Sequence, residues 1–245
     1  MLHSLINTGI SARLKQDIYL EYQEEKRQLA ETWEKSLSKE LSTKLDIGID
    51  PKVIPVPYNQ KLYDHIVYDH RGCYDRAKEP NRVFDGEPLK SMALGGSIPA
   101  TMATLVEYFS VTHKTGKKIS SREEFLIEIG KILVENGYRT QDKGTLWIAF
   151  DKVLELEYGI RTQIQRSIFE VSNSICLCHP VVALVPTGWL HGKDLPSNEC
   201  VIIWKIKEGV ATISNTSSNE LYEIDVMSLL RHAKIAWACS VKKLL

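Results

Sequence analysis

The stretch Gly95-Gly96-Ser97-Ile98-Pro99-Ala100-Thr101-Met102-Ala103-Thr104-Leu105 joins two glycines to a run of small and apolar residues. Proline suits the first turn of a helix, because its missing N–H would have no partner there. The glycines allow the backbone to approach other groups closely just before that helix. We therefore expect a loop that places Ser97 at the start of a buried helix, which runs from about Pro99 to Phe109.

The composition narrows the class of protein. Lys+Arg and Asp+Glu number 31 each among 245 residues, and this zero net charge argues against a general binder of nucleic acid or acidic membranes. No uncharged apolar run approaches ~20 residues, so we expect no membrane span. The odd count of 5 cysteines indicates reduced thiols rather than a disulfide framework. Residues 1–9 lack the basic and apolar pattern of a signal peptide. We expect a cytoplasmic protein.

The N-terminal part predicts a helical extension over residues 1–51, followed by a domain over 52–245. Residues 11–46 are rich in Glu, Lys, Gln and Leu and contain no Pro or Gly, which favours one long helix. Gly48 and Pro51 would end it. Its apolar residues recur every four positions, which is not a heptad pattern. Two interpretations stay open: an arm for oligomerisation or a partner, or a helix lying on its own domain.

Within the domain, helices precede strands, an order typical of α+β folds. Residues 52–60 are expected to form a strand and 61–95 an irregular insertion. The segment Ser121-Arg122-Glu123-Glu124 is a capping box that opens a helix to about Glu135. Further segments are expected in this order: helix 145–157 ending at Gly159, strand 161–165, helix 167–174, strands 181–185, 201–207, 210–214 and 221–224, helix 226–232, and strand 235–241.

The stretch around Ser97 resembles the nucleophile motif of bacterial bacteriocin-processing peptidases, which cut after double-glycine leaders and belong to the papain-like cysteine hydrolases. Their motif reads Gly-Cys-Gly-Pro-Thr/Ser and then an apolar helix. In this chain Cys has become Ser97 and the following Gly has become Ile98. Other matching segments, which extend the resemblance over about 53–241, are Val56-Pro57-Tyr58-Asn59-Gln60, Asn136-Gly137-Tyr138, Gly144-Thr145-Leu146-Trp147, His179-Pro180-Val181-Val182-Ala183, Cys200-Val201-Ile202-Ile203-Trp204, Ser214-Asn215-Thr216 and Ala236-Trp237-Ala238-Cys239-Ser240.

The resemblance implies a papain-like fold, a helical half against an antiparallel sheet, with a degenerate catalytic centre. Ser97 takes the place of the nucleophile, Cys200 that of the imidazole and Asn215 that of the orienting Asp. Gln60, which helps to form the family's oxyanion hole, is retained. Cysteine hydrolysis requires a thiolate with an imidazole beside it. The implied activity is therefore absent, and no cofactor is implied.

Other functional interpretations of the histidines and cysteines stay open. Ser97 or Cys200 could act as the nucleophile of a rearranged hydrolase, with His191 or a histidine of the 61–95 insertion as its base. Metal binding by His65, His70 and Cys73 is not favoured, because their spacing matches no standard zinc site. Cys176, Cys178 and His179 lack the spacing of a haem attachment motif, and we expect the cysteines there to belong to the core.

The most consistent hypothesis is a catalytically inactive pseudopeptidase that binds a peptide or partner protein in the remaining cleft. Ile98, Trp189 and His191 are expected to line this cleft. A purely structural subunit that assembles through the N-terminal helix is the other non-enzymatic hypothesis. We expect neither metal nor nucleic acid as a ligand.

Overall fold

The computed structural model describes residues 20, 24, 46–69, 72–81, 91–113, 118–140, 144–193, 195 and 197–241. Within these residues no helix is long and apolar enough to cross a lipid bilayer. The expected helix over 11–46 lies outside them except for Leu20 and Glu24, which are both helical. His70 also lies outside the described residues.

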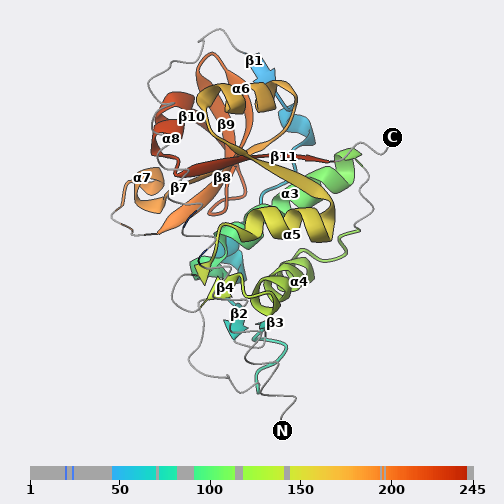
Figure 1. Ribbon diagram of the computed structural model, residues 1–245. Coiled ribbons are helices and arrows are strands. Elements are labelled where there is room, and N and C mark those ends of the chain that lie inside the picture. Colours follow the sequence, from blue (N-terminus) through green and yellow to red (C-terminus); the bar gives the residue numbers. More distant parts are fainter. Residues whose placement is uncertain are drawn as a thin grey trace.

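A seven-stranded antiparallel sheet forms the centre of the fold (Figure 1). The strand order is β10-β9-β8-β7-β11-β6, and β1 pairs with the second half of β8. The sequence prediction of an α+β chain with an antiparallel sheet is confirmed. The strands are β1 (Asp46–Gly48), β6 (Ile160–Gln165), β7 (Val181–Pro186), β8 (Asn198–Lys207), β9 (Val210–Asn215), β10 (Leu221–Asp225) and β11 (Ile235–Val241).

Helices cover both faces of the sheet, because successive residues of its inner strands are apolar on both sides. Val182 and Trp204 belong to one hydrophobic cluster, and Val181 and Ile203 belong to the other. Figure 1 shows α3 and α5 on one side of the sheet and α6 and α8 on the other. The helices are α3 (Ser97–His113), α4 (Arg122–Glu135), α5 (Ala149–Tyr158), α6 (Ile168–Cys176) and α8 (Val226–His232).

Helix α3 is the central helix of the larger cluster. It begins at Ser97, and every residue from Ser97 to Val106 is buried. Tyr108 packs edge-on against Trp204 of β8, with ring centroids 5.2 Å apart. Burying large aromatic side chains contributes roughly 1.5–3 kcal/mol each relative to leaving them exposed. This contact therefore fixes the C-terminal half of α3 against the sheet.

The expected strand over 52–60 is wrong. The segment holds Pro55 and Pro57, and proline cannot donate a ladder hydrogen bond. The chain instead forms 3₁₀ turns at η1 (Pro51–Val53) and η2 (Gln60–Tyr63). The first strand of the sheet is β1, which begins at Asp46 and precedes residue 52, where the domain was expected to start. Asp46 therefore belongs to a strand and not to the end of the expected helix over 11–46.

The segment 61–95 is more regular than expected. A hairpin of β2 (Ile66–Asp69) and β3 (Gly72–Asp75) packs on α4, and α2 (Met92–Gly95) precedes α3. The hairpin contact needs Gly130, since a Cβ there would lie 2.5 Å from the Cys73 sulfur. The helix expected over 145–157 begins later, at Ala149. The remaining short elements are β4 (Arg139–Thr140), β5 (Gly144–Thr145) and α7 (Thr187–His191).

Candidate functional site

A buried arginine fixes the end of α2, the short helix that stands before α3 where a loop was expected. Arg139 is 6% exposed, and its Nη1 donates to the Gly95 carbonyl at 2.7 Å and to Thr145 Oγ1 at 2.9 Å. Its guanidinium lies 3.6 Å from the centre of the Tyr68 ring. Burial lowers the pKa of Arg139. A Cβ at position 95 would lie 2.8 Å from the guanidinium, so a larger residue there would displace the Arg139 side chain.

The Ser97 hydroxyl sits between the start of α3 and the sheet. Its Oγ accepts a hydrogen bond from the Cys200 backbone N–H at 2.7 Å. The Thr216 hydroxyl lies 3.2 Å from Ser97 Oγ and 3.2 Å from a Glu199 carboxylate oxygen. A hydroxyl has one hydrogen and can donate to only one of these oxygens at a time. The Thr216 hydroxyl therefore donates either to Ser97 Oγ or to Glu199 Oε1, and it connects these two side chains.

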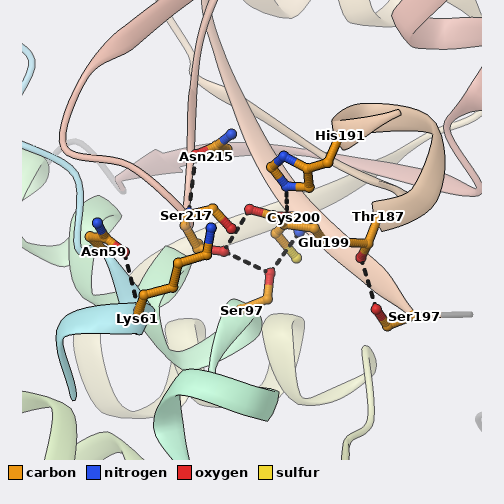
Figure 2. Close-up of polar contacts among 11 residues, drawn as sticks. Asn59, Lys61, Ser97, Thr187, His191, Ser197, Glu199, Cys200, Asn215 and Ser217 are labelled. Carbon is orange, nitrogen blue, oxygen red and sulfur yellow. Dashed lines mark hydrogen bonds and ion pairs between the residues drawn. The ribbon is translucent and has the colours of Figure 1, made fainter. Parts of the chain in front are cut away.

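Glu199 extends this network to a histidine (Figure 2). His191 Nε2 lies 2.7 Å from Glu199 Oε2. Glu199 is 2% exposed, whereas the side chain of His191 is 26% exposed. A buried carboxylate needs donors, because leaving it unpaired would cost several kcal/mol. The network thus runs from Ser97 through Thr216 and Glu199 to His191.

Gln60, the expected oxyanion-hole residue, and Asn215, the expected orienting residue, both lie beside the Ser97–Thr216–Glu199 network, and each forms a hydrogen bond with a backbone group there. The Gln60 N–H donates to the Thr216 carbonyl at 2.8 Å. Asn215, at the end of β9, is adjacent to Thr216, and its Oδ1 accepts the Ser217 N–H at 3.0 Å. This turn occupies the Asn215 oxygen. Among the described residues, no imidazole forms a hydrogen bond with Asn215 or with Ser97 Oγ.

Cys200 is close to Ser97 but is enclosed in the core. The residue is 0% exposed and belongs to the larger hydrophobic cluster. Burial raises the pKa of its thiol from about 9.0 to about 12, although the neighbouring Ser97 hydroxyl acts in the opposite direction. A thiol in this environment stays protonated near neutral pH and is a poor nucleophile.

A cavity of about 730 Å³ opens beside the network. Of the sequence-predicted site residues, Gln60, Ser97, Ile98 and His191 line it, and Glu199 lines it as well. Ser97 is 9% exposed and Ile98 is 7% exposed. The volume is typical of pockets that bind small ligands or short chain segments.

Trp189 does not belong to this cleft. Its ring stacks on the His232 ring, with centroids 4.4 Å apart and an angle of 12° between the planes. It packs against the smaller hydrophobic cluster on the α6 and α8 side of the sheet. The expectation that Trp189 lines the cleft is therefore wrong, because the turn of α7 directs it to the opposite side from His191.

Two exposed cysteines correct a further expectation. Cys176 ends α6, and Cys178 follows it with a positive φ of 57°. Both are exposed rather than part of the core. An extended segment leading into β7 would place these cysteines on a buried face, but α6 continues to Cys176 and a turn separates it from β7.

A second polar cluster lies away from the cleft. Ligand-type atoms of His65, Asp75 and Glu123 lie within 4.8 Å of one another. The ammonium of Lys78 already lies 3.2 Å from Glu123 and 3.6 Å from Asp75. This lysine is the internal counter-ion of both carboxylates. Cys73, which the sequence grouped with His65, is buried at the hairpin instead.

Sequence reasoning missed Glu199 and Thr216, which connect the site. Glu199 did give a signal, because it is an acidic residue placed directly before the apolar run of a buried strand. Such a residue is rarely buried without a specific partner. Thr216 gave no local signal, because it lies 119 residues from Ser97 in the chain.

Comparisons with protein-family models, curated proteins and solved structures find no match for this chain. The geometry of the cleft and its network therefore carries the functional argument.

Proposed function

We propose that this protein is a papain-like pseudopeptidase without hydrolytic activity, which binds a peptide segment in the cleft beside Ser97. One observation carries the proposal: the hydroxyl at the start of α3 is used within a network, while the nearby imidazole of His191 is bound to Glu199. A serine hydroxyl needs a base close to it to become a nucleophile. General-base assistance contributes roughly 10²–10⁴-fold to such reactions.

The cleft itself supports a binding role. It has room for a few residues of an extended chain, about 3.3–3.6 Å of length per residue, and it presents both polar groups and apolar side chains. Pockets with that mixture orient ligands through a few polar groups and gain affinity from apolar contact.

Hydrolysis by the unmodified protein is the first test. We expect no cleavage of a peptide library and no appearance of activity in Ser97→Cys. In the single variant, iodoacetamide labelling at position 97 should be slow, because no imidazole is placed to form a thiolate–imidazolium pair. Adding Cys200→His should accelerate labelling at that position. Peptide mapping by mass spectrometry is needed, since Cys176 and Cys178 are exposed and will also react.

The hydrogen-bond chain favours one second candidate, a serine hydrolase with a rearranged base. In that reaction the Ser97 hydroxyl would turn toward Thr216, and its proton would pass to the Thr216 oxygen as the Thr216 proton passes to Glu199. Ser97 Oγ would attack a carbonyl carbon, and the C=O π electrons would move to the carbonyl oxygen. The tetrahedral intermediate would then expel the leaving group, which takes the proton back from Glu199, and water would hydrolyse the acyl–Ser97 ester. Cleavage by the wild type that is lost in both Ser97→Ala and Glu199→Gln would establish this candidate and overturn the pseudopeptidase. The burial of Cys200 argues against the variant of this hypothesis in which Cys200 is the nucleophile.

A further inference from the structure

The positively charged side chains that line the cleft are exposed to a ligand, whereas the acidic side chain is buried. The described ionisable groups of the cleft are Lys61, Lys193, His191 and Glu199. Glu199 is 2% exposed and is bound by His191 and Thr216. Lys61 and Lys193 are exposed, and neither forms an ion pair with another described residue. The charge that a ligand meets at these positions is therefore positive, although the chain as a whole is neutral.

The two lysines approach the cleft from different parts of the chain. Lys61 belongs to η2, and its backbone N–H is held by Asn59 Oδ1 at 3.1 Å. Figure 2 shows its side chain turned toward Ser217, near the network around Ser97. Lys193 follows α7, where its N–H donates to the Gly188 carbonyl at 3.0 Å. The backbone of each lysine is thus fixed.

Exposed leucines accompany these charges. Leu94 of α2 is 74% exposed and Leu195 is 42% exposed, and both line the same cavity. Trp147 and Ile98 contribute apolar surface deeper in the cavity wall. Large exposed apolar side chains that gather at a cavity are typical of binding surfaces rather than of ordinary solvent-exposed surface.

We infer that the cleft binds an extended segment of a partner protein in which acidic residues alternate with large apolar residues. This inference rests on the proposed peptide-binding function and names the class of peptide. Carboxylates of the segment would meet Lys61 and Lys193, and its apolar side chains would cover Leu94 and Leu195. Charge complementarity of this kind increases the association rate and rejects segments of the wrong charge.

Fluorescence anisotropy with three labelled nine-residue peptides tests the inference on the full chain. The peptides alternate Leu with Asp, Leu with Asn, or Leu with Lys. We expect the Asp peptide to bind tightest and the Lys peptide weakest, with a difference that shrinks as salt increases. Lys61→Gln and Lys193→Gln should each weaken the Asp peptide about two- to five-fold and leave the Asn peptide unchanged.

Two further variants locate the effect. Lys131→Gln removes an exposed lysine of α4, which is not part of the cavity, and should change none of the affinities. Leu94→Asp places a negative charge at the cleft and should weaken the Asp peptide while strengthening the Lys peptide. Leu94 is sufficiently exposed for this change to leave the core intact.

The outcomes separate the inference from the function on which it rests. Equal binding of the Asp and Asn peptides, or an equal effect of Lys131→Gln and Lys61→Gln, would overturn the inferred peptide class while peptide binding itself stands. Tightest binding of the Lys peptide would overturn it as well. If none of the three peptides binds the wild type, both the inference and the peptide-binding function are refuted.

Discussion

Replacing Ser97 with alanine tests whether the hydroxyl at the start of α3 has become a structural group. In the wild type, Ser97 Oγ accepts the Cys200 N–H at 2.7 Å and lies 3.2 Å from Thr216 Oγ1. In Ser97→Ala the Cys200 N–H is left in a fully buried position without this acceptor. A buried donor that loses its partner costs about 1–3 kcal/mol.

The structure places the expected cost in the lower part of that range. Thr216 does not become unsatisfied, because its hydroxyl still has Glu199 Oε1 at 3.2 Å. Only the backbone donor of Cys200 is lost, so we expect Ser97→Ala to lower the free energy of unfolding by about 1–2 kcal/mol. For a chain of this size, that corresponds to a Tm lower by roughly 2–8 °C.

Urea unfolding followed by circular dichroism measures this change. The midpoint should move to lower urea with an unchanged m-value, since the folded surface stays the same. Ser110→Ala is the matched control in the same helix, because the Ser110 hydroxyl donates at 2.7 Å to the Val106 carbonyl, within its own helix. We expect the control to change stability by less than about 0.5 kcal/mol, since alanine is the better helix former.

A double-mutant cycle sharpens the test. Ser97→Ala combined with Thr216→Val should show a coupling energy of about 0.5 kcal/mol or more, because contacting residues of one hydrogen-bond network are not additive. The reasoning is refuted if Ser97→Ala is no more destabilising than Ser110→Ala, or if positions 97 and 216 prove additive.

Two further predictions concern the core and the sheet. Burial raises the pKa of the Cys200 thiol to about 12 and that of Cys239 well above its usual value, so unfolding should release protons above pH 9. For Cys200, stability should be fully present well below pH 9 and should fall by about 1.4 kcal/mol per pH unit as pH rises from 9 toward 12, and Cys239 should contribute in the same direction. Urea unfolding between pH 8 and 10.5 should show a shallower dependence of stability on pH in Cys200→Ala, and an identical dependence would contradict the assignment. In the same assay, Gly48→Ala should lower the free energy of unfolding by about 2 kcal/mol or more beyond the loss in Gly144→Ala. Both glycines have positive φ, but only a Cβ at position 48 would lie 2.5 Å from the Trp204 carbonyl oxygen. Equal losses in the two variants would show that β1 does not pair closely with β8.

The sequence by itself determined the elements whose signals are local. Ser121 caps α4 by accepting the Glu124 N–H at 3.3 Å, as the capping box predicted. Gly159 ends α5 with a φ of 65°, and Asp225 caps α8 through the Ser228 N–H at 2.6 Å. These interactions join residues within one turn, so the spacing of residue types is sufficient to predict them.

The position of Ser97 at the start of a buried helix was likewise predictable, because glycine, proline and the following apolar run are neighbours in the chain. The hairpin of β2 and β3 and the pairing of β1 were not predicted. Both are short, and each is stabilised by a distant element: the hairpin by α4 and β1 by β8. Propensity over three or four residues is too weak to indicate strands that depend on such contacts.

Only the tertiary structure decided how the site is connected. Packing α3 against the first residues of β8 brings Ser97 to Cys200, which is 103 residues away in the chain, and the end of β9 adds Thr216. Alternation along β8 places Cys200 in the core and leaves Glu199 to bind His191. Trp189 and His191 are two residues apart, yet α7 turns one toward the smaller hydrophobic cluster and the other into the cleft. The residue types were visible in the sequence, but their partners were set by the packing of elements far apart in the chain, because a hydrogen bond depends on distances of about 3 Å that no local pattern encodes.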